Sequence, residues 1–98
     1  MSDEEKIMKM ISLITGDRTR ASIAVTLDKK RSASYNELKR TVERLERKEI
    51  SDGKFNWHLK QLELNQVIMK TNTGYVLTNE GKNAVSIVRK AFKYYDKK

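Results

Sequence analysis

Side chains suited to recognising another molecule are concentrated between Gly53 and Leu62. If this segment is a helix, successive residues lie about 100° apart, so Phe55, Leu59 and Leu62 form an inner apolar stripe. The other sides of the helix then carry Lys54, Asn56, Trp57, Lys60 and Gln61. Amides can hydrogen-bond adenine, lysines can bind guanine or phosphate, and an aromatic ring can contact a thymine methyl group. Gly53 would let the backbone approach a phosphate at the start of the helix. This face is predicted to enter the major groove of double-stranded DNA.

The same residues have other interpretations, which the sequence leaves open. The lysines and amides would also suit an ordinary solvent-exposed helix face. Trp57 could instead pack against a hairpin or a neighbouring helix, or contact a partner protein. His58 lies beside the inner stripe, and we expect it to be packed and hydrogen-bonded within the domain rather than to contact DNA.

The composition excludes several classes of site. The 98 residues include 21 Lys or Arg and 13 Asp or Glu, so the net charge of +8 favours a polyanion as partner. The absence of cysteine excludes disulfides, thiolate zinc sites and cysteine nucleophiles. A single histidine, His58, excludes a multi-histidine metal site within one chain. We therefore expect no enzyme activity, no metal and no cofactor.

The ends and the hydropathy pattern give an expected location. No apolar run reaches about 18 residues, so we expect no transmembrane helix and no membrane partner. The first residues, Met1 to Lys6, are acidic and lack the apolar centre of a signal peptide. The prediction is a cytoplasmic, nucleoid-associated protein that forms one domain over residues 1–98.

Apolar spacing and capping residues predict a mainly α-helical fold with a small β-hairpin. Helices are expected at about 3–15, 18–28, 52–64 and 79–95, with another beginning at Tyr35. Tyr35, Leu38, Val42 and Leu45 are the expected apolar stripe of that helix. The predicted caps are Ser2, Asp17, Ser34 and Thr78, and Asn65 is expected to end the fourth helix in a left-handed conformation.

This order of elements is the layout of a winged helix-turn-helix, with the helix-turn-helix at 34–64 and the wing at 67–77. In the wing, small polar side chains and one lysine are predicted to contact DNA phosphate or sugar, namely Lys70, Thr71, Asn72 and Thr73. A solvated turn is the alternative. Arg18 and Arg20 could touch phosphates or pair with acidic neighbours.

The terminal helices, 1–15 and 79–98, are predicted to form a homodimer interface. Their apolar residues amount to more surface than so small a domain can easily bury, and comprise Ile7, Met10, Ile11, Ile14, Val85, Val88, Phe92 and Tyr95. Met8 lies off that stripe, which also suggests a contact outside the domain's own core. The alternative is that the two helices pack together within one chain.

Four strings in this order resemble ArsR-like winged-helix transcriptional regulators, in particular archaeal members. They are Leu13 to Arg20 (LITGDRTR), Ser34 to Leu38 (SYNEL), Gly53 to Leu62 (GKFNWHLKQL) and Gly74 to Gly81 (GYVLTNEG). The resemblance spans about residues 7–92 and implies a dimeric, DNA-binding transcriptional regulator whose first and last helices form the dimer contact. The chain departs from that family in its long link over residues 40–50 and in lacking the metal ligands of the metal-sensing members.

Three functions remain open from the sequence. The first is a sequence-specific transcriptional regulator, and the second is a nonspecific architectural protein that binds nucleic acid. The second draws support from the charge distribution, because residues 51–78 hold three cations and two anions, whereas residues 17–50 hold ten and six. The third is a protein-interaction module that uses Trp57 and the apolar terminal helices.

Overall fold

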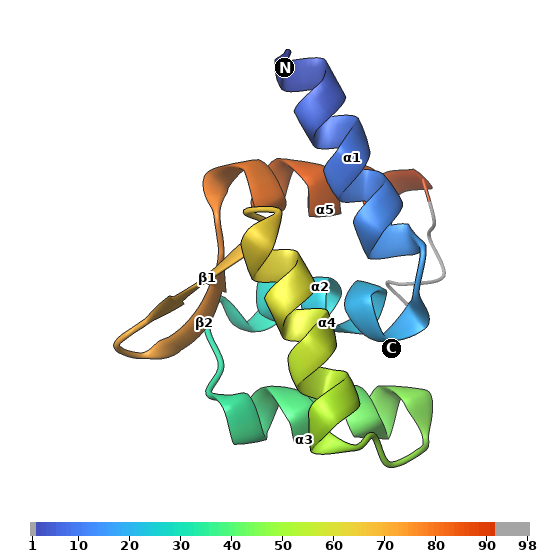
Figure 1. The fold of residues 1–98 in the computed structure, drawn as a ribbon, viewed down its shortest axis with the longest axis vertical. Coiled ribbons are helices and arrows are strands. Elements are labelled where there is room, and N and C mark those ends of the chain that lie inside the picture. The colour runs from blue at the N-terminus through green and yellow to red at the C-terminus, as the bar shows by residue number, and fades with distance from the viewer. Residues whose placement is uncertain (1, 92–98) are drawn as a thin grey trace.

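The computed structural model describes residues 2–91, and these form five helices and one two-stranded antiparallel hairpin (Figure 1). The elements are α1 (Asp3–Thr15), α2 (Arg18–Lys30), α3 (Tyr35–Glu46), α4 (Asp52–Leu64), β1 (Ile68–Thr71), β2 (Gly74–Leu77) and α5 (Asn79–Ala91). The mainly helical fold with a small hairpin is thus confirmed, in a layout compatible with a winged helix. The rest of the predicted last helix, with Phe92 and Tyr95, lies outside the described residues.

Side-chain caps explain where the helices begin. The Ser2 hydroxyl accepts a hydrogen bond from the Glu5 amide, and the Glu5 carboxylate accepts one from the Ser2 amide, which makes a complete capping box. The Asp17 carboxylate accepts hydrogen bonds from the first amides of α2. Ser34 and Ser51 cap α3 and α4 in the same way. The predicted caps at Ser2, Asp17 and Ser34 are confirmed.

Two predicted helix ends were wrong. Helix α2 ends at Lys30, two residues further than expected, and is followed by Arg31, whose φ is 74°. Asn65 has a φ of −95° and is not left-handed. The left-handed residue is Gln66, with a φ of 63°. The Val67 amide donates a hydrogen bond to the Leu62 carbonyl, which places the left-handed residue one position after Asn65.

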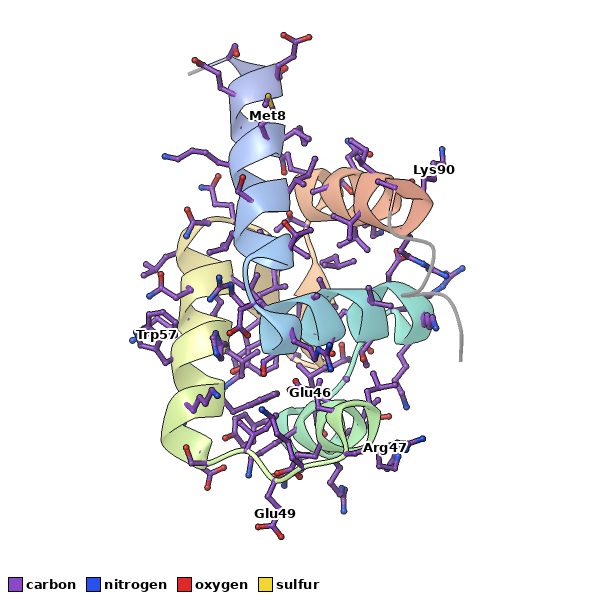
Figure 2. The ribbon with its side chains drawn as sticks, turned by 90° about the vertical axis from the view of Figure 1, so that its right-hand side faces the viewer. Met8, Glu46, Arg47, Glu49, Trp57 and Lys90 are labelled. Atoms are coloured by element: carbon purple, nitrogen blue, oxygen red, sulfur yellow. The ribbon has the colours of Figure 1, made fainter. Side chains whose placement is uncertain are left out.

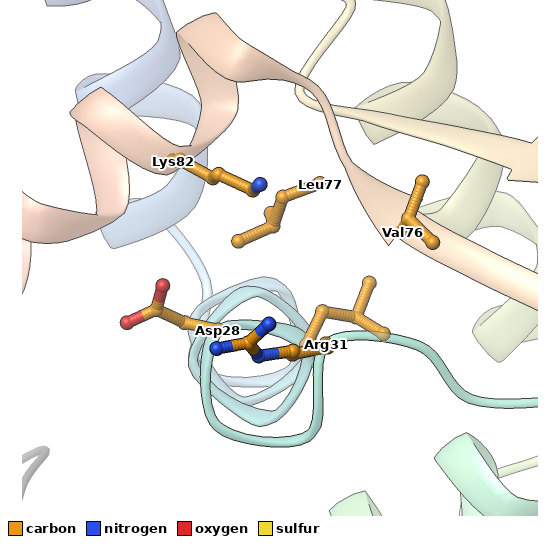
Figure 3. A pocket seen from close by; sticks show the side chains of 6 residues that line it. Asp28, Arg31, Val76, Leu77 and Lys82 are labelled. Atoms are coloured by element: carbon orange, nitrogen blue, oxygen red, sulfur yellow. The ribbon is translucent and has the colours of Figure 1, made fainter.

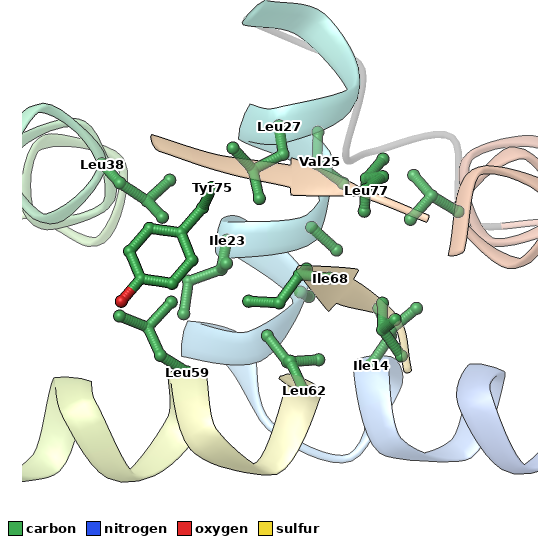
Figure 4. Close-up of a cluster of buried hydrophobic side chains, with 14 of the residues drawn as sticks. Ile14, Ile23, Val25, Leu27, Leu38, Leu59, Leu62, Ile68, Tyr75 and Leu77 are labelled. Atoms are coloured by element: carbon green, nitrogen blue, oxygen red, sulfur yellow. The ribbon is translucent and has the colours of Figure 1, made fainter. Parts of the chain in front are cut away.

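Helix α2 runs through the middle of the core. Ile23, Ala24 and Leu27 are at most 1% exposed and form its inner face. Side chains from the other helices and the hairpin surround it (Figure 4). Leu45, predicted for the apolar stripe of α3, is 55% exposed, and Ile50 in the link to α4 is buried instead. The link over residues 40–50 is therefore accommodated by a longer α3, which ends in a left-handed Arg47.

The hairpin is attached to the body by a third extended segment. Ile68 pairs with Leu77 and Thr71 with Gly74, which leaves Asn72 and Thr73 as a two-residue turn. Ala33, just before α3, exchanges backbone hydrogen bonds with Tyr75 at 3.2 and 2.8 Å. This pairing joins the hairpin to the link between α2 and α3.

A second attachment lies where the hairpin meets α5. The Thr78 hydroxyl accepts a hydrogen bond from the Gly81 amide at 2.9 Å and donates one to the Gln66 carbonyl at 2.6 Å. This arrangement confirms Thr78 as the predicted cap. A Cβ atom at Gly81 would overlap the Val67 carbonyl oxygen. The first turn of α5 can therefore approach the base of the hairpin only with glycine at this position.

Gly81→Ala is expected to lower the free energy of unfolding by about 1–3 kcal/mol, because the added methyl group has no space. Gly53→Ala is the control. Nothing lies within 4 Å of a Cβ placed there, so this change is expected to raise the stability by about 0.5–1 kcal/mol through the helical preference of alanine. Urea unfolding measures both. Equal stability of the two variants would contradict the packing described at Gly81.

Candidate nucleic-acid interface

The outer face of α4 is open to solvent. Phe55, Leu59 and Leu62 are at most 2% exposed and point into the core, as predicted. The opposite residues Gly53, Lys54, Asn56, Trp57 and Lys60 are exposed, and Gln61 is half-buried. The structure therefore brings together on one face all six positions that the sequence selected on this helix.

Trp57 projects away from the body of the domain (Figure 2). Its side chain is 55% exposed, so within residues 2–91 neither the hairpin nor another helix covers it, and that packing alternative was wrong. The indole meets the His58 ring edge-to-face, with centroids 5.1 Å apart. The Trp57 ring is thus packed against His58, while more than half of the side chain stays exposed to solvent.

The lysines of this face have no carboxylate beside them. Neither Lys54 nor Lys60 forms an ion pair with any residue in the described range 2–91. The nearby Asp52 is held by the Tyr35 hydroxyl at 2.8 Å and by the Lys39 ammonium at 3.1 Å. Both charges on the α4 face are therefore free to meet an anion.

The same Asp52 contacts join the beginnings of α3 and α4. The hydrogen bond from Tyr35, followed by that from Lys39, lowers the pKa of Asp52, so the carboxylate stays ionised. Burial and the bond to Asp52 raise the pKa of Tyr35 to about 12, so the phenol keeps the proton that it donates. These two contacts add a polar link between α3 and the first turn of α4.

His58 anchors the middle of α4. The residue is 3% exposed, which confirms the predicted packed role. Its Nδ1 lies 3.2 Å from the Arg20 guanidinium and its Nε2 lies 3.5 Å from Asp17 Oδ1. Because an arginine can only donate, Nδ1 accepts, and the imidazole proton sits on Nε2, facing Asp17. Arg20 also donates to the Leu13 carbonyl at 2.6 Å. It forms no ion pair with an acid between residues 2 and 91, so the predicted acid pairing is not observed, and phosphate contact stays a prediction.

The electrostatics of this cluster keep His58 neutral and Asp17 charged. Burial lowers the pKa of His58, and the charges of Arg20 and Lys54 add to this against the opposing pull of Asp17. Burial also disfavours the Asp17 anion, but the backbone hydrogen bonds from Arg20 and Thr19 and the neighbouring His58 outweigh it and lower the pKa of Asp17. The cluster is therefore suited to support α4, not to transfer protons to a ligand.

The hairpin tip carries fewer free groups than predicted. Lys70, Asn72 and Thr73 are exposed. Thr71 is half-buried, and its hydroxyl donates to the Gly74 carbonyl at 3.0 Å and accepts from the Thr73 amide, so it shapes the turn. The Lys70 ammonium lies 5.8 Å from the centre of the Tyr75 ring. One lysine and two polar side chains remain available to a ligand.

The predicted dimer residues fall into three groups. Met10, Ile14, Val85 and Val88 are at most 1% exposed within the single chain, where α1 crosses α5 (Figure 1). For these four, the alternative of packing inside one chain is the one observed, because core residues present no surface. Ile7 and Ile11 are half-buried. Phe92 and Tyr95 lie outside the described residues.

The structure adds two residues that the sequence did not select, Leu64 and Ile87. Leu64 is 70% exposed on the outer face of α4, and its spacing of four from Lys60 could have revealed it. On the terminal helices, Met8 and Ile87 are 67% and 46% exposed. They line an open cavity of about 500 Å³ together with Asp3, Glu4, Ile7 and Ile11. Met8 lies off the inner stripe, as the sequence indicated.

Other kinds of site were searched for over the same range. Between residues 2 and 91, no three His, Cys, Asp or Glu side chains gather as metal ligands would. The described helices are also too short or too polar to cross a bilayer.

Comparison with known proteins gives one family. Residues 9–88 match the family described as a domain of unknown function, DUF7347. No curated protein and no solved structure matches the chain.

We expect acidification to destabilise the protein through His58. Unfolded histidine titrates near pH ~6.5, whereas the pKa of His58 in the fold is lower. Below about pH 6.5 the unfolded chain therefore binds a proton that the folded chain does not, and stability falls as pH drops towards the folded pKa. Urea unfolding at about pH 7.5 and about pH 5.5 measures this slope.

His58→Gln is expected to be less stable at neutral pH and to lose most of this slope. Asp17 affects stability at lower pH than His58 does. Its pKa is lowered in the fold, so the stability that its ionised form adds is lost only when the pH falls below the range in which His58 titrates. An unchanged slope in His58→Gln would show that another group titrates.

Proposed function

We propose that this chain, which belongs to the DUF7347 family, is a winged helix-turn-helix protein that binds specific sequences of double-stranded DNA as a homodimer and regulates transcription. The observation that carries the proposal is the outer face of α4. It is exposed, firmly supported from behind, and provided with lysines that have no acid partner between residues 2 and 91.

The chemistry of this face suits base recognition. An α-helix fits the major groove, which is about 12 Å wide. Asn56 and Gln61 can each donate and accept towards adenine, while Lys60 can donate to guanine or a phosphate. The exposed Trp57 offers an apolar surface for a thymine methyl group. The rigid support from Asp52 and His58 reduces the ordering that binding would require.

The hairpin is suited to hold the backbone beside that groove. Lys70, Asn72 and Thr73 are exposed near its tip. The pairing of Ala33 with Tyr75 fixes the part of β2 next to the turn to the link that leads into α3. Contacts of this kind set the register of a protein on DNA and carry little sequence information.

The homodimer is proposed through the exposed parts of α1 and α5. Met8, Ile87 and the half-buried Ile7 and Ile11 leave apolar surface around one cavity. Two copies related by a twofold axis could cover this apolar surface. Such a dimer would read two half-sites about 34 Å apart.

One observation favours the alternative, a nonspecific architectural nucleic-acid-binding protein. Arg40 and Arg44 are exposed and lie one turn apart on α3, and the exposed Arg47 follows directly after that helix. Among residues 2–91 none of them forms an ion pair. A backbone-directed surface of this kind would bind any sequence, with a steep dependence on salt.

Selection of bound sequences from random duplex DNA at two salt concentrations separates these functions. A specific regulator enriches one near-palindromic sequence at both salt concentrations. A nonspecific binder enriches none, and its affinity only falls as salt rises.

Asn56→Ala is expected to weaken binding to the selected sequence about tenfold or more, while random DNA is affected much less, because a base contact is worth about 1–3 kcal/mol. Lys60→Ala should behave similarly. The matched controls are Asn83→Ala and Lys90→Ala, exposed residues of the same types on α5. Fluorescence anisotropy at fixed salt measures each affinity. Equal losses of affinity for selected and random DNA would show that α4 contacts only the DNA backbone.

Replacing both Met8 and Ile87 by Gln is expected to convert the dimer into a monomer, because it removes exposed apolar surface without touching the core. Analytical ultracentrifugation measures the mass. Leu45→Gln, an exposed apolar residue on α3, is the control and should remain dimeric. A monomeric unmodified chain, or a dimeric double variant, would refute this interface.

A further inference from the structure

A pocket of about 450 Å³ lies between the end of α2, strand β2 and the first turn of α5 (Figure 3). Leu27, Val76 and Leu77 give it apolar walls, and Asp28, Arg31 and Lys82 line it with charges. Its volume is within the range of about 300–1,000 Å³ that is usual for small-molecule sites. No residue of α4 lines it, so it is separate from the candidate DNA interface.

The charges of this pocket favour an anion. Asp28 already has a cationic partner, because its carboxylate accepts a hydrogen bond from Arg89 at 2.5 Å. Arg31 and Lys82 have no acid partner within the described range 2–91. With Asp28 neutralised by Arg89, two positive charges remain. The carbonyl end of α2 opposes an anion. Lys29 in the last turn of α2 offsets part of that effect, whereas Lys30 is paired with Glu37 at 3.2 Å.

The backbone at Arg31 is unusual. Its φ of 74° and ψ of −46° lie in a region that side-chain-bearing residues rarely occupy. Such a conformation costs about 1–3 kcal/mol, and it persists where the surrounding structure imposes it, often beside a bound ligand. Here it places the arginine at the edge of the pocket, two residues before Ala33 pairs with the hairpin.

We propose that this pocket binds a small organic carboxylate with an apolar body. The planar guanidinium of Arg31 matches a carboxylate in geometry, and the Lys82 ammonium adds a second charge-assisted contact. The walls of Leu27, Val76 and Leu77 bury the hydrocarbon part. Inorganic phosphate and polyphosphates have no hydrocarbon part to cover these apolar walls, so the pocket favours the organic carboxylate.

Such a ligand would connect α2 to the hairpin. It would contact Arg31 on one side and Val76 on the other, and Val76 follows the Tyr75 that pairs with Ala33. Its binding is therefore expected to affect the backbone pairing of Ala33 with Tyr75. The site does not depend on DNA binding, so either proposal can fail alone.

The test is a titration of the full-length, isotopically labelled chain followed by amide chemical shifts. The probes are benzoate and hexanoate, with acetate and inorganic phosphate as anions that lack an apolar body. Benzoate is expected to shift the amides of Arg31, Val76, Leu77 and Lys82 with a Kd of about 1 mM or tighter. Acetate and phosphate are expected to bind at least about tenfold more weakly.

Lys82→Gln should weaken benzoate binding about tenfold or more, because it removes a charge-assisted hydrogen bond. Arg31→Gln should do the same, and Lys90→Gln, on α5 outside the pocket, should change nothing. The proposal is overturned if benzoate and hexanoate shift no pocket amide at about 10 mM. It is also overturned if phosphate binds as tightly as benzoate, or if Lys82→Gln binds like Lys90→Gln.

Discussion

The burial of one side of α4 decides what the rest of the structure can offer. Phe55, Leu59 and Leu62 are almost fully enclosed, and each such side chain contributes about 1.5–3 kcal/mol when it leaves water. The exposed contacts of Asp52 contribute far less. Apolar packing therefore determines which side faces solvent, while Asp52 and His58 add polar contacts to α3 and to the start of α2. The outer face of α4 is therefore available to another molecule because the opposite, apolar face is packed into the core.

The hairpin depends on attachments at both ends of its second strand. Two strands of four residues are marginal in water on their own. Ala33 adds backbone pairing near the turn, and Thr78 with Gly81 closes the base against α5. Gly74 belongs to the same arrangement, since its φ is 126° and a Cβ there would overlap the Ala33 carbonyl. The hairpin is thus held to the link before α3 as well as to α5, and its orientation relative to α4 is defined.

Most of the fold was predictable because its signals are local. The caps at Ser2 and Asp17 and the apolar spacing along α4 act within a few residues, and the structure follows them closely. The errors occurred where contacts between residues far apart in the sequence determine burial or strand pairing. Leu45 follows the helical pattern but is 55% exposed, while Ile50 is buried. Ala33 lies between two expected helices and becomes a strand partner of Tyr75, more than forty residues away.

The candidate site was predictable to a similar extent and for a similar reason. Helical geometry alone identified the outer face of α4, because the residues opposite a buried apolar stripe must face solvent. It could not show that Trp57 is uncovered, since this depends on the length and path of the hairpin. It also could not assign Arg20, whose bonds to the Leu13 carbonyl and to His58 follow from the way α1, α2 and α4 meet. Four of the terminal apolar residues filled the core because α1 and α5 cross within one chain.

The distribution of charge suggests how affinity and specificity would be divided in the proposed DNA complex. Residues 51–78 carry three cations and two anions, so α4 and the hairpin alone would attract DNA weakly. The larger attraction would come from α3 and its C-terminal end, where Arg40, Arg44 and Arg47 are exposed. Phosphate contacts of this kind are independent of sequence, so they raise the affinity for all DNA equally. Discrimination between sequences then rests on Asn56, Lys60 and Gln61, whose contacts with base edges differ from one sequence to another.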